Sequence, residues 1–219
     1  MASFNLVDRP WIPCVTVEGK YEEQSLLQVL TEPHRVREIV DPVPTITVAL
    51  HRLLLAILHR ALDGPRDEDE WAALWEKGRW DPERLRAYLE TWRHRFDLFD
   101  ADRPFYQSRE VDLKYAAPVT KLTHEMASPS NGVLLFDHTL PERVRLSARA
   151  AARYLVAHQA FAVGGLVSGT GPQKYARAAP LCKAAVCLIK GPDLARTLIL
   201  NLHRYDPERG EPFRYSDPD

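Results

Sequence analysis

The sequence predicts a mixed α/β (α+β) domain that is mostly helical and carries a small, largely antiparallel sheet. A long apolar pattern of helical period runs from Pro44 to Leu62, and further helical segments with clear start and stop signals follow it. Short strand-like runs interrupted by prolines open the chain. The 219 residues, 45% hydrophobic and 27% charged, are enough for one domain with a substantial core.

The first half of the chain is expected to hold a strand pair and four helices. Residues 4–19 are interpreted as two short strands, which their prolines would confine to edges or turns. Residues 25–30 are a short helix, and residues 44–62 form a long one that Gly64-Pro65 ends. Segment 67–78 begins with four acids, which the helix macrodipole favours in a first turn, and ends at a glycine.

The next helix and the second half are less regular. Asp81 followed by Pro82 is a strong helix start, and this helix is expected to run to about Phe96. Residues 101–141 lack periodicity and form a long excursion, of a length that is usually functional or disordered. A helix over 142–163 follows, then the glycine-rich residues, a strand near 183–191 and a helix over 192–203. The polar tail predicts that the chain is the front part of something longer.

The cysteines and the hydropathy indicate the cellular compartment in which the protein is expected to reside. Cys14, Cys182 and Cys187 form no C-x-x-C pair, and an odd number of cysteines argues against a disulfide framework. The N-terminus resembles no signal peptide, and the longest apolar stretch, Val48–Leu58, is too short to span a bilayer. We therefore expect a cytoplasmic protein with no membrane partner.

Charge is distributed unevenly behind a formal net charge of −1. Residues 63–103 carry twelve acids and eight bases, whereas residues 142–204 carry ten bases and two acids, a local charge of +8. Such an asymmetry points to a polyanionic partner. The alternative is a solvated helical face that happens to be rich in arginine.

Four of the ten glycines fall between Gly164 and Gly171. A backbone without Cβ atoms lets another molecule approach closely, and successive N–H groups can form an anion-binding concavity. The segment is neither a Walker loop nor a dinucleotide fingerprint. The alternative is a helix C-cap at Gly164 followed by a wide turn. Close approach of a ligand to the backbone of this segment is the preferred interpretation.

Basic residues flank this segment. Arg145, Arg149 and Arg153 are four residues apart, so they would form one stripe on the predicted helix, where they repel unless they are neutralised. Phosphates would neutralise them; the alternative is pairing with the acidic first half of the chain. Lys174 and Arg177 are further, weaker candidates for phosphate contacts.

Within the excursion, Asn131-Gly132 signals a turn and Phe136 lies in an apolar patch. An exposed aromatic that stacks on a base and a buried loop anchor are both open interpretations. An acid–base or metal site would have to use His124, Asp137 and His138, whose spacing matches no ligand pattern. No catalytic residue, metal site or cofactor is predicted.

Five stretches, in this order, resemble a known family: FNLVDRPWIP, RPFYQSR, KLTHEMASPSNGVLLFDHT, QAFAVGGLVSG and DLARTLILNL. Together they are similar to the N-terminal region of the CasA-type large subunit of the type I-E CRISPR surveillance complex, Cascade. The resemblance covers residues 4–203. It departs at Val163-Gly164-Gly165, where relatives often carry three glycines, and at Val167, where they often carry a lysine.

The resemblance implies a non-enzymatic subunit. It would recognise the motif adjacent to the target in double-stranded DNA, assist R-loop initiation and dock a helicase-nuclease. The implied partners are double-stranded DNA, the guide RNA 5′ handle, the other Cascade subunits and that helicase-nuclease. Residues 1–219 would be the N-terminal domain, because the family's wedge region and C-terminal helical bundle lie beyond this chain.

The resemblance also implies roles for two segments. The glycine loop that approaches the motif duplex from the minor groove, where base pairs are poorly distinguished, would consist of Gly164, Gly165, Leu166, Val167, Ser168 and Gly169. The excursion would reach the guide RNA and a neighbouring subunit through Asn131, Gly132, Leu134, Leu135, Phe136, Asp137 and His138. The rival hypotheses are an enzyme that binds a phosphorylated small molecule, with His138 or His124 as acid–base, and a structural adaptor.

Overall fold

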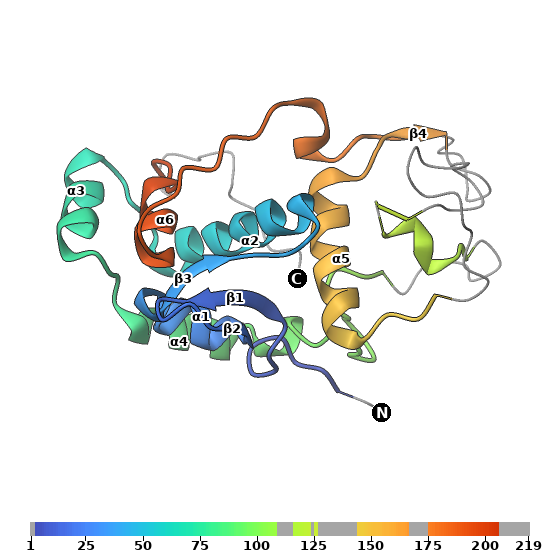
Figure 1. The fold of residues 1–219 in the computed structure, drawn as a ribbon, viewed down its shortest axis with the longest axis horizontal. Helices are drawn as coiled ribbons and strands as arrows, with labels where there is room; N and C mark the ends of the chain where they lie inside the picture. Colours follow the sequence, from blue (N-terminus) through green and yellow to red (C-terminus); the bar gives the residue numbers. More distant parts are fainter. Residues whose placement is uncertain (1–2, 109–115, 124, 127–143, 167–174, 206–219) are drawn as a thin grey trace.

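A computed structural model of the chain describes residues 3–108, 116–123, 125–126, 144–166 and 175–205 (Figure 1). A three-stranded antiparallel sheet has the order β2-β1-β3, with the strands β1 (Ile12–Thr16), β2 (Tyr21–Gln24) and β3 (Val36–Ile39). Cys14 in the central strand pairs with Glu22 on one side and Ile39 on the other. Gly19, with a φ of 85°, makes the turn between β1 and β2.

Helices make up most of the remaining secondary structure. The α-helices are α1 (Leu26–Thr31), α2 (Pro44–Leu62), α3 (Glu68–Lys77), α4 (Pro82–Thr91), α5 (Ala148–Phe161) and α6 (Leu194–Leu200). Short 3-10 turns are η1 (Pro33–Arg35), η2 (Arg93–Arg95), η4 (Val119–Lys121) and η5 (Pro180–Lys183). A two-stranded antiparallel hairpin joins β4 (Gly165–Leu166) to β5 (Tyr175–Ala176). The predicted fold class, a mostly helical α+β domain with a small antiparallel sheet, is confirmed.

Local sequence signals explain where the helices begin and end. Ser25 forms a capping box with Gln28 at the start of α1. The side chain of Asp81 accepts a hydrogen bond from the backbone of Glu83 at the start of α4. Gly78, with a φ of 63°, ends α3 in the left-handed conformation that glycine adopts without strain.

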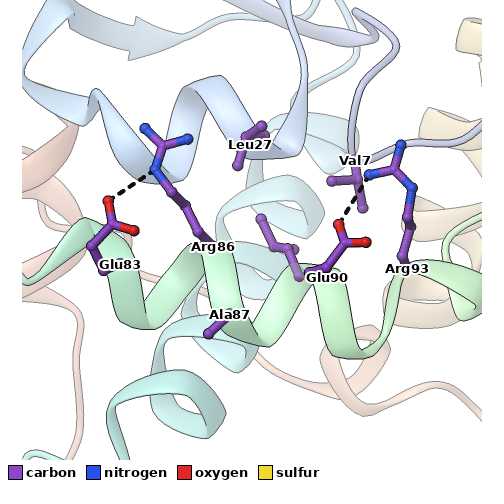
Figure 2. Close-up of a pocket in the computed structure, with 8 residues that line it drawn as sticks. Val7, Leu27, Glu83, Arg86, Ala87, Glu90 and Arg93 are labelled. Carbon is purple, nitrogen blue, oxygen red and sulfur yellow. Dashed lines mark hydrogen bonds and ion pairs between the residues drawn. The ribbon is translucent and has the colours of Figure 1, made fainter.

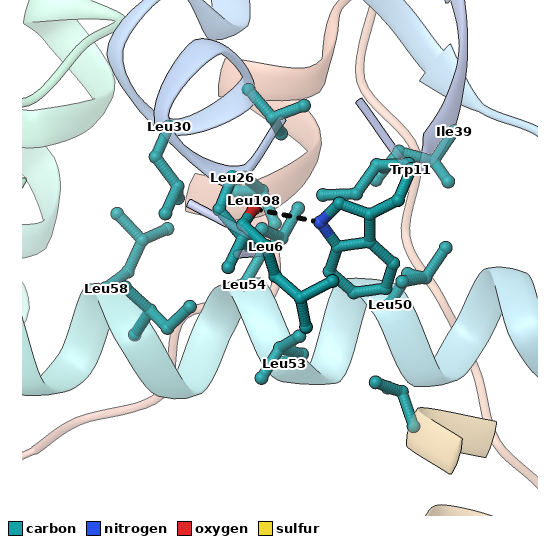
Figure 3. Close-up of a cluster of buried hydrophobic side chains, with 14 of the residues drawn as sticks. Leu6, Trp11, Leu26, Leu30, Ile39, Leu50, Leu53, Leu54, Leu58 and Leu198 are labelled. Carbon is teal, nitrogen blue, oxygen red and sulfur yellow. Dashed lines mark hydrogen bonds between the residues drawn. The ribbon is translucent and has the colours of Figure 1, made fainter. Parts of the chain in front are cut away.

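The core is built around α2, which packs against α5, α4, α6 and β3. Its buried side chains meet those of the N-terminal segment and of α1 and α6, as Figure 3 shows for Leu54, Leu26 and Leu198. Trp11 is fully buried in this cluster, and its indole Nε1 donates to the carbonyl of Leu6 at 3.1 Å. By length and composition α2 could cross a membrane, but here its apolar face is occupied by the core.

The strand pair predicted for residues 4–19 is wrong. This range supplies only one ladder strand, β1, and both of its partners come from later residues. The opening residues pair instead with a segment far along the chain: Leu6 N donates to Phe96 O at 2.9 Å, and Leu98 N donates to Phe4 O at 3.1 Å. A turn before β1 redirects the chain, with Arg9 N donating to Asn5 O at 2.9 Å. The prolines do not confine the strand to an edge either, because Pro13 lies in β1, the central strand of the sheet.

Three other predicted elements are corrected. The helix predicted to begin at residue 142 starts at Ala148, because the side chain of Ser147 caps it and residues 144–147 are not helical. The helix predicted to reach Phe96 ends at Thr91 and continues only as the 3-10 turn η2. The strand predicted near 183–191 pairs with no strand in the described part of the chain.

Candidate nucleic-acid interface

Helix α5 is the element that carries the glycine segment, and buried charges fix its position. Arg153 donates to Glu23 on β2 at 2.6 Å and to Asp41, just before α2, at 3.2 Å. The three side chains are only 13%, 16% and 6% exposed. Arg149, one turn earlier, also pairs with Glu23. The helix is thereby tied to the sheet and to the start of α2.

The other side of α5 holds the stem of the excursion. The hydroxyl of Tyr154 donates to the carboxylate of Glu125, and burial together with this hydrogen bond raises the pKa of the tyrosine. Thr120 and Thr123 are buried in the same stem. In Figure 1 the stem and β4 both lie on the side of α5 that faces away from α2.

The glycine hairpin begins directly after α5. Gly165 pairs with Ala176 and Leu166 pairs with Tyr175 in an antiparallel register. Ala179 N donates to Ala162 O at 2.8 Å and closes the base of the hairpin. Val163 and Tyr175, at its edge, are 82% and 63% exposed. The described part of the hairpin is therefore accessible from outside the molecule.

Gly164 and Gly165 lack a side chain for different structural reasons. A Cβ on Gly164 would lie 2.6 Å from Ala178 N and 2.9 Å from Ala176 O, so the returning strand leaves no room for a side chain there. Gly164 does not cap the helix, because the C-cap of α5 is Ala162. A Cβ on Gly165 would meet nothing within 4 Å. Packing requires the first glycine, whereas the second leaves backbone open to the outside.

Accessible positive charge lies next to this open backbone. Arg177, directly after β5, and Lys183, in η5, are exposed and have no ion-pair partner in the described part of the chain. Residues 144–166 and 175–192 contain no aspartate or glutamate. The local positive potential is therefore not cancelled by acids close in sequence.

The predicted arginine stripe is altered in geometry. Arg145 precedes the helix and is exposed, so only Arg149 and Arg153 share a helical face. Those two arginines pair with acids from the first half of the chain, which is the alternative left open above. A phosphate contact from any of these arginines, or from Arg177, stays a prediction.

Several predicted site residues lie outside the described residues and are not placed here. They are Val167, Ser168, Gly169 and Lys174 of the glycine segment, and Asn131, Gly132, Leu134, Leu135, Phe136, Asp137, His138 and His124 of the excursion. Conversely, sequence reasoning missed Tyr175 and Lys183. In the sequence, Tyr175 was marked only by its position two residues before Arg177. The structure shows that its ring is exposed, and an exposed aromatic ring is a common stacking platform for a base.

Nothing described elsewhere in the molecule forms a stronger site. A shallow hollow of about 430 Å³ lies between α4 and the α1 region, and Figure 2 shows it lined by Val7, Leu27 and charged residues of α4 and η2. Its charges are already paired with one another, Arg86 with Glu83 and Arg93 with Glu90. Among the described residues, no three His, Cys, Asp or Glu side chains are grouped to hold a metal ion.

The fold and this interface together define a class: an α+β domain that presents a glycine hairpin with open backbone beside uncompensated positive charge. Comparison with known proteins makes the class specific. The model of the CRISPR-associated protein Cse1 family matches residues 5–218, and the chain belongs to that family.

Individual relatives agree with this assignment. The CRISPR-associated protein CasA/Cse1 of Thermus thermophilus is 41% identical over 213 residues, which are 97% of this chain and 42% of the relative. A solved structure of Thermus thermophilus CasA (Cse1) superposes with a TM-score of 0.82 at 38% identity, covering 95% of this chain and 41% of that one. A chain of a CRISPR RNA-guided surveillance complex, pre-nicking, gives a TM-score of 0.77 at 27% identity over 93% of this chain and 43% of that one. The chain thus spans about two-fifths of the length of these relatives.

Proposed function

We propose that this chain is the N-terminal domain of the large subunit of a type I-E CRISPR Cascade complex. In this proposal it recognises the motif adjacent to the target in double-stranded DNA through residues 164–169. The observation that carries the proposal is the open space beside Gly165 on an accessible hairpin. A duplex can approach the main chain there without meeting a side chain at that position.

The charges near the hairpin fit a duplex ligand. Arg177 and Lys183 are exposed and available to neutralise phosphates. Phosphate contacts supply affinity and register without reading sequence. The exposed Tyr175 offers an additional contact at the hairpin edge. A site of this composition binds the backbone of DNA and reads few base identities.

The way in which the hairpin would recognise a DNA motif follows from the chemistry of the minor groove. The minor groove distinguishes A·T from G·C but little else, so a reader built from main chain tolerates several related motifs. Full sequence specificity then falls to pairing with the guide RNA. The excursion, with Phe136 as its key side chain, contacts the guide 5′ handle and a neighbouring subunit. The subunit assists R-loop initiation, docks the helicase-nuclease, and itself carries no catalytic residue.

The decisive experiment compares two glycines whose structural surroundings are alike. Gly165 and Gly19 both have positive φ, and a Cβ added at either would meet nothing within 4 Å, but Gly19 lies in the β1–β2 turn. Gly165→Leu is expected to weaken binding of the guide-loaded complex to a motif-bearing duplex by at least about tenfold, equivalent to about 1.4 kcal/mol. Gly19→Leu should leave that affinity unchanged. Equal affinity of the two variants in an electrophoretic mobility assay would refute the hairpin as the reader.

A salt series separates DNA binding from the rival enzyme hypothesis. The logarithm of the duplex affinity should fall linearly with the logarithm of the salt concentration. Replacing Arg177 or Lys183 by alanine should reduce that slope by about one each if each contacts a phosphate. Arg35→Ala, which removes an exposed cation already paired with Glu32, is the control. A ligand affinity that does not depend on salt would instead favour a small-molecule site.

A further inference from the structure

A short segment before α6 has strand-like composition but no strand partner among the described residues. Residues 184–188, Ala-Ala-Val-Cys-Leu, connect η5 to α6, and Figure 1 shows the chain drawn out between these two elements. Ala184 has extended backbone angles, φ −142° and ψ 159°. Within the part of the chain that the structure describes, no backbone N–H or carbonyl of 185–188 makes a hydrogen bond.

Both ends of this segment are nevertheless held in place. On one side, η5 packs against α5. On the other, Ile189 N donates to Asn201 Oδ1 at 3.1 Å, and Asn201 Nδ2 donates back to Ile189 O at 2.6 Å. Lys190 Nζ pairs with Glu38 on β3 at 2.6 Å. The segment is therefore a stretched edge fixed at two points, rather than a loose linker.

The contact with Asn201 sets which backbone groups face outward. The amide of Asn201 bonds both the N–H and the carbonyl of Ile189, as an opposing strand residue would. Backbone groups alternate sides along an extended chain, so those of Leu188 and Val186 point away from Asn201. Those of Cys187 and Ala185 point toward the side on which Asn201 lies.

The side chains along this edge are also exposed. Val186 is 40% exposed, Ile189 is 55% exposed, and Cys187 is exposed between them. Unpaired backbone groups beside exposed β-branched side chains form a template for an added strand. In β-augmentation, main-chain hydrogen bonds supply the affinity and alternate side chains supply the specificity.

The length of the relatives and the path of the chain indicate what covers this edge. More than half of each matched relative lies outside the match to this chain. The last described residue, Tyr205, follows Asn201 by only four residues, and Asn201 contacts the edge itself. A strand that follows this domain in the same polypeptide is tethered to Tyr205 through residues 206–219, so it meets the edge as an intramolecular partner at raised effective concentration. We propose that residues 184–188 accept a β-strand from the portion of the large subunit that lies beyond this domain.

This assembly surface rests on the proposal that the chain is the N-terminal domain of a longer subunit. It uses no residue of the hairpin, so it can fail or hold separately from the DNA-binding role. The probes for its test are overlapping peptides of about 12 residues, roughly twice the length of a typical strand. They cover the part of the Thermus thermophilus relative outside its match to this chain. Each is labelled and titrated with the 219-residue chain by fluorescence anisotropy. At least one peptide is expected to bind.

A matched pair of proline variants tests the geometry. Val186→Pro removes an outward N–H and should lower the affinity of the bound peptide by at least about tenfold. Ala185→Pro removes an N–H that faces the Asn201 side, and it should leave that affinity within about twofold, because Ala184 already has the extended angles that a following proline requires. Far-UV circular dichroism of both variants should match that of the parent chain, since neither N–H is bonded in the described structure.

Amide hydrogen exchange gives a second, independent readout. In the bound chain, the amides of Val186 and Leu188 should become protected while those of Ala185 and Cys187 remain fast. The inference is overturned if no peptide binds, if both proline variants lower the peptide affinity equally, or if protection from exchange does not alternate between neighbouring residues of 185–188. Self-association of the chain that is lost in Val186→Pro would also overturn it, because the occupant would then be a second copy.

Discussion

Arg153 offers the sharpest test of how the domain holds its candidate interface. Its guanidinium lies between Glu23 and Asp41, and all three side chains are largely buried. Arg153→Met keeps an unbranched stem of apolar atoms but leaves two carboxylates without this cation. Breaking a buried pair by removing one partner costs about 3–5 kcal/mol. Glu23 retains Arg149, so the lower part of this range is expected.

The assay is thermal unfolding followed by circular dichroism, with urea unfolding to obtain the free energy. For a chain of this size, a loss of about 3 kcal/mol lowers Tm by roughly 6–12 °C. The control is Arg149→Met, because the side chain of Arg149 is 50% exposed and such pairs contribute only about 0–1 kcal/mol. Adding Glu23→Gln to Arg153→Met should recover part of the loss, with a coupling of about 0.5–3 kcal/mol. Equal destabilisation by Arg149→Met and Arg153→Met would refute the buried cluster as the clamp on α5.

Three further predictions concern the core, the pH dependence and the thiols. Leu54→Ala removes a fully buried side chain from α2 and should cost about 2–5 kcal/mol in urea unfolding; a loss below about 1 kcal/mol would contradict the packing. Burial lowers the pKa of His51, so the folded chain binds fewer protons than the unfolded chain below about pH 6.5. Stability should therefore fall as pH drops below that value, by up to about 1.4 kcal/mol per pH unit, and His51→Gln should reduce this slope in urea titrations from pH 7.5 to 5. Cys187 is exposed and should react rapidly with a thiol reagent, whereas Cys14, buried and with a pKa raised to about 12, should react only on unfolding; early labelling of Cys14 would show that the sheet opens.

Several helix boundaries were predicted correctly from the sequence because their signals are local. Residues 44–62 were predicted with the observed bounds, since an apolar stripe and a following Gly-Pro mark them. Asp81-Pro82 and Gly78 were likewise sufficient to place a helix start and a helix stop. Each of these signals acts within one or two turns of the chain.

The sheet and the ion pairs were not readable because their partners are distant in sequence. Nothing near residue 5 indicates that it forms a bridge with Asp97. The spacing of Arg149 and Arg153 predicted a shared face but could not identify Glu23 as their partner, more than 120 residues away. The strand-like run before α6 has the right composition, but a ladder also needs a neighbour, which the described chain does not supply.

The dipeptide Gly164-Gly165 shows what could not be predicted from the sequence. Sequence reasoning assigned Gly164 and Gly165 the same role, because both lack a side chain. Only the structure shows that Ala178 excludes a side chain from the first position while the second faces open space. The residues that surround a glycine in three dimensions, and not the glycine itself, decide which reason applies.

The attachment of α5 on two sides has a consequence for how this domain fails. Arg153 ties the helix to the sheet, and its neighbour Tyr154 ties it to the stem of the excursion. The hairpin grows from the end of the same helix. A substitution that loosens α5 would therefore displace the hairpin and the excursion together. Such a variant should lose both proposed contacts at once and should not retain one of them alone.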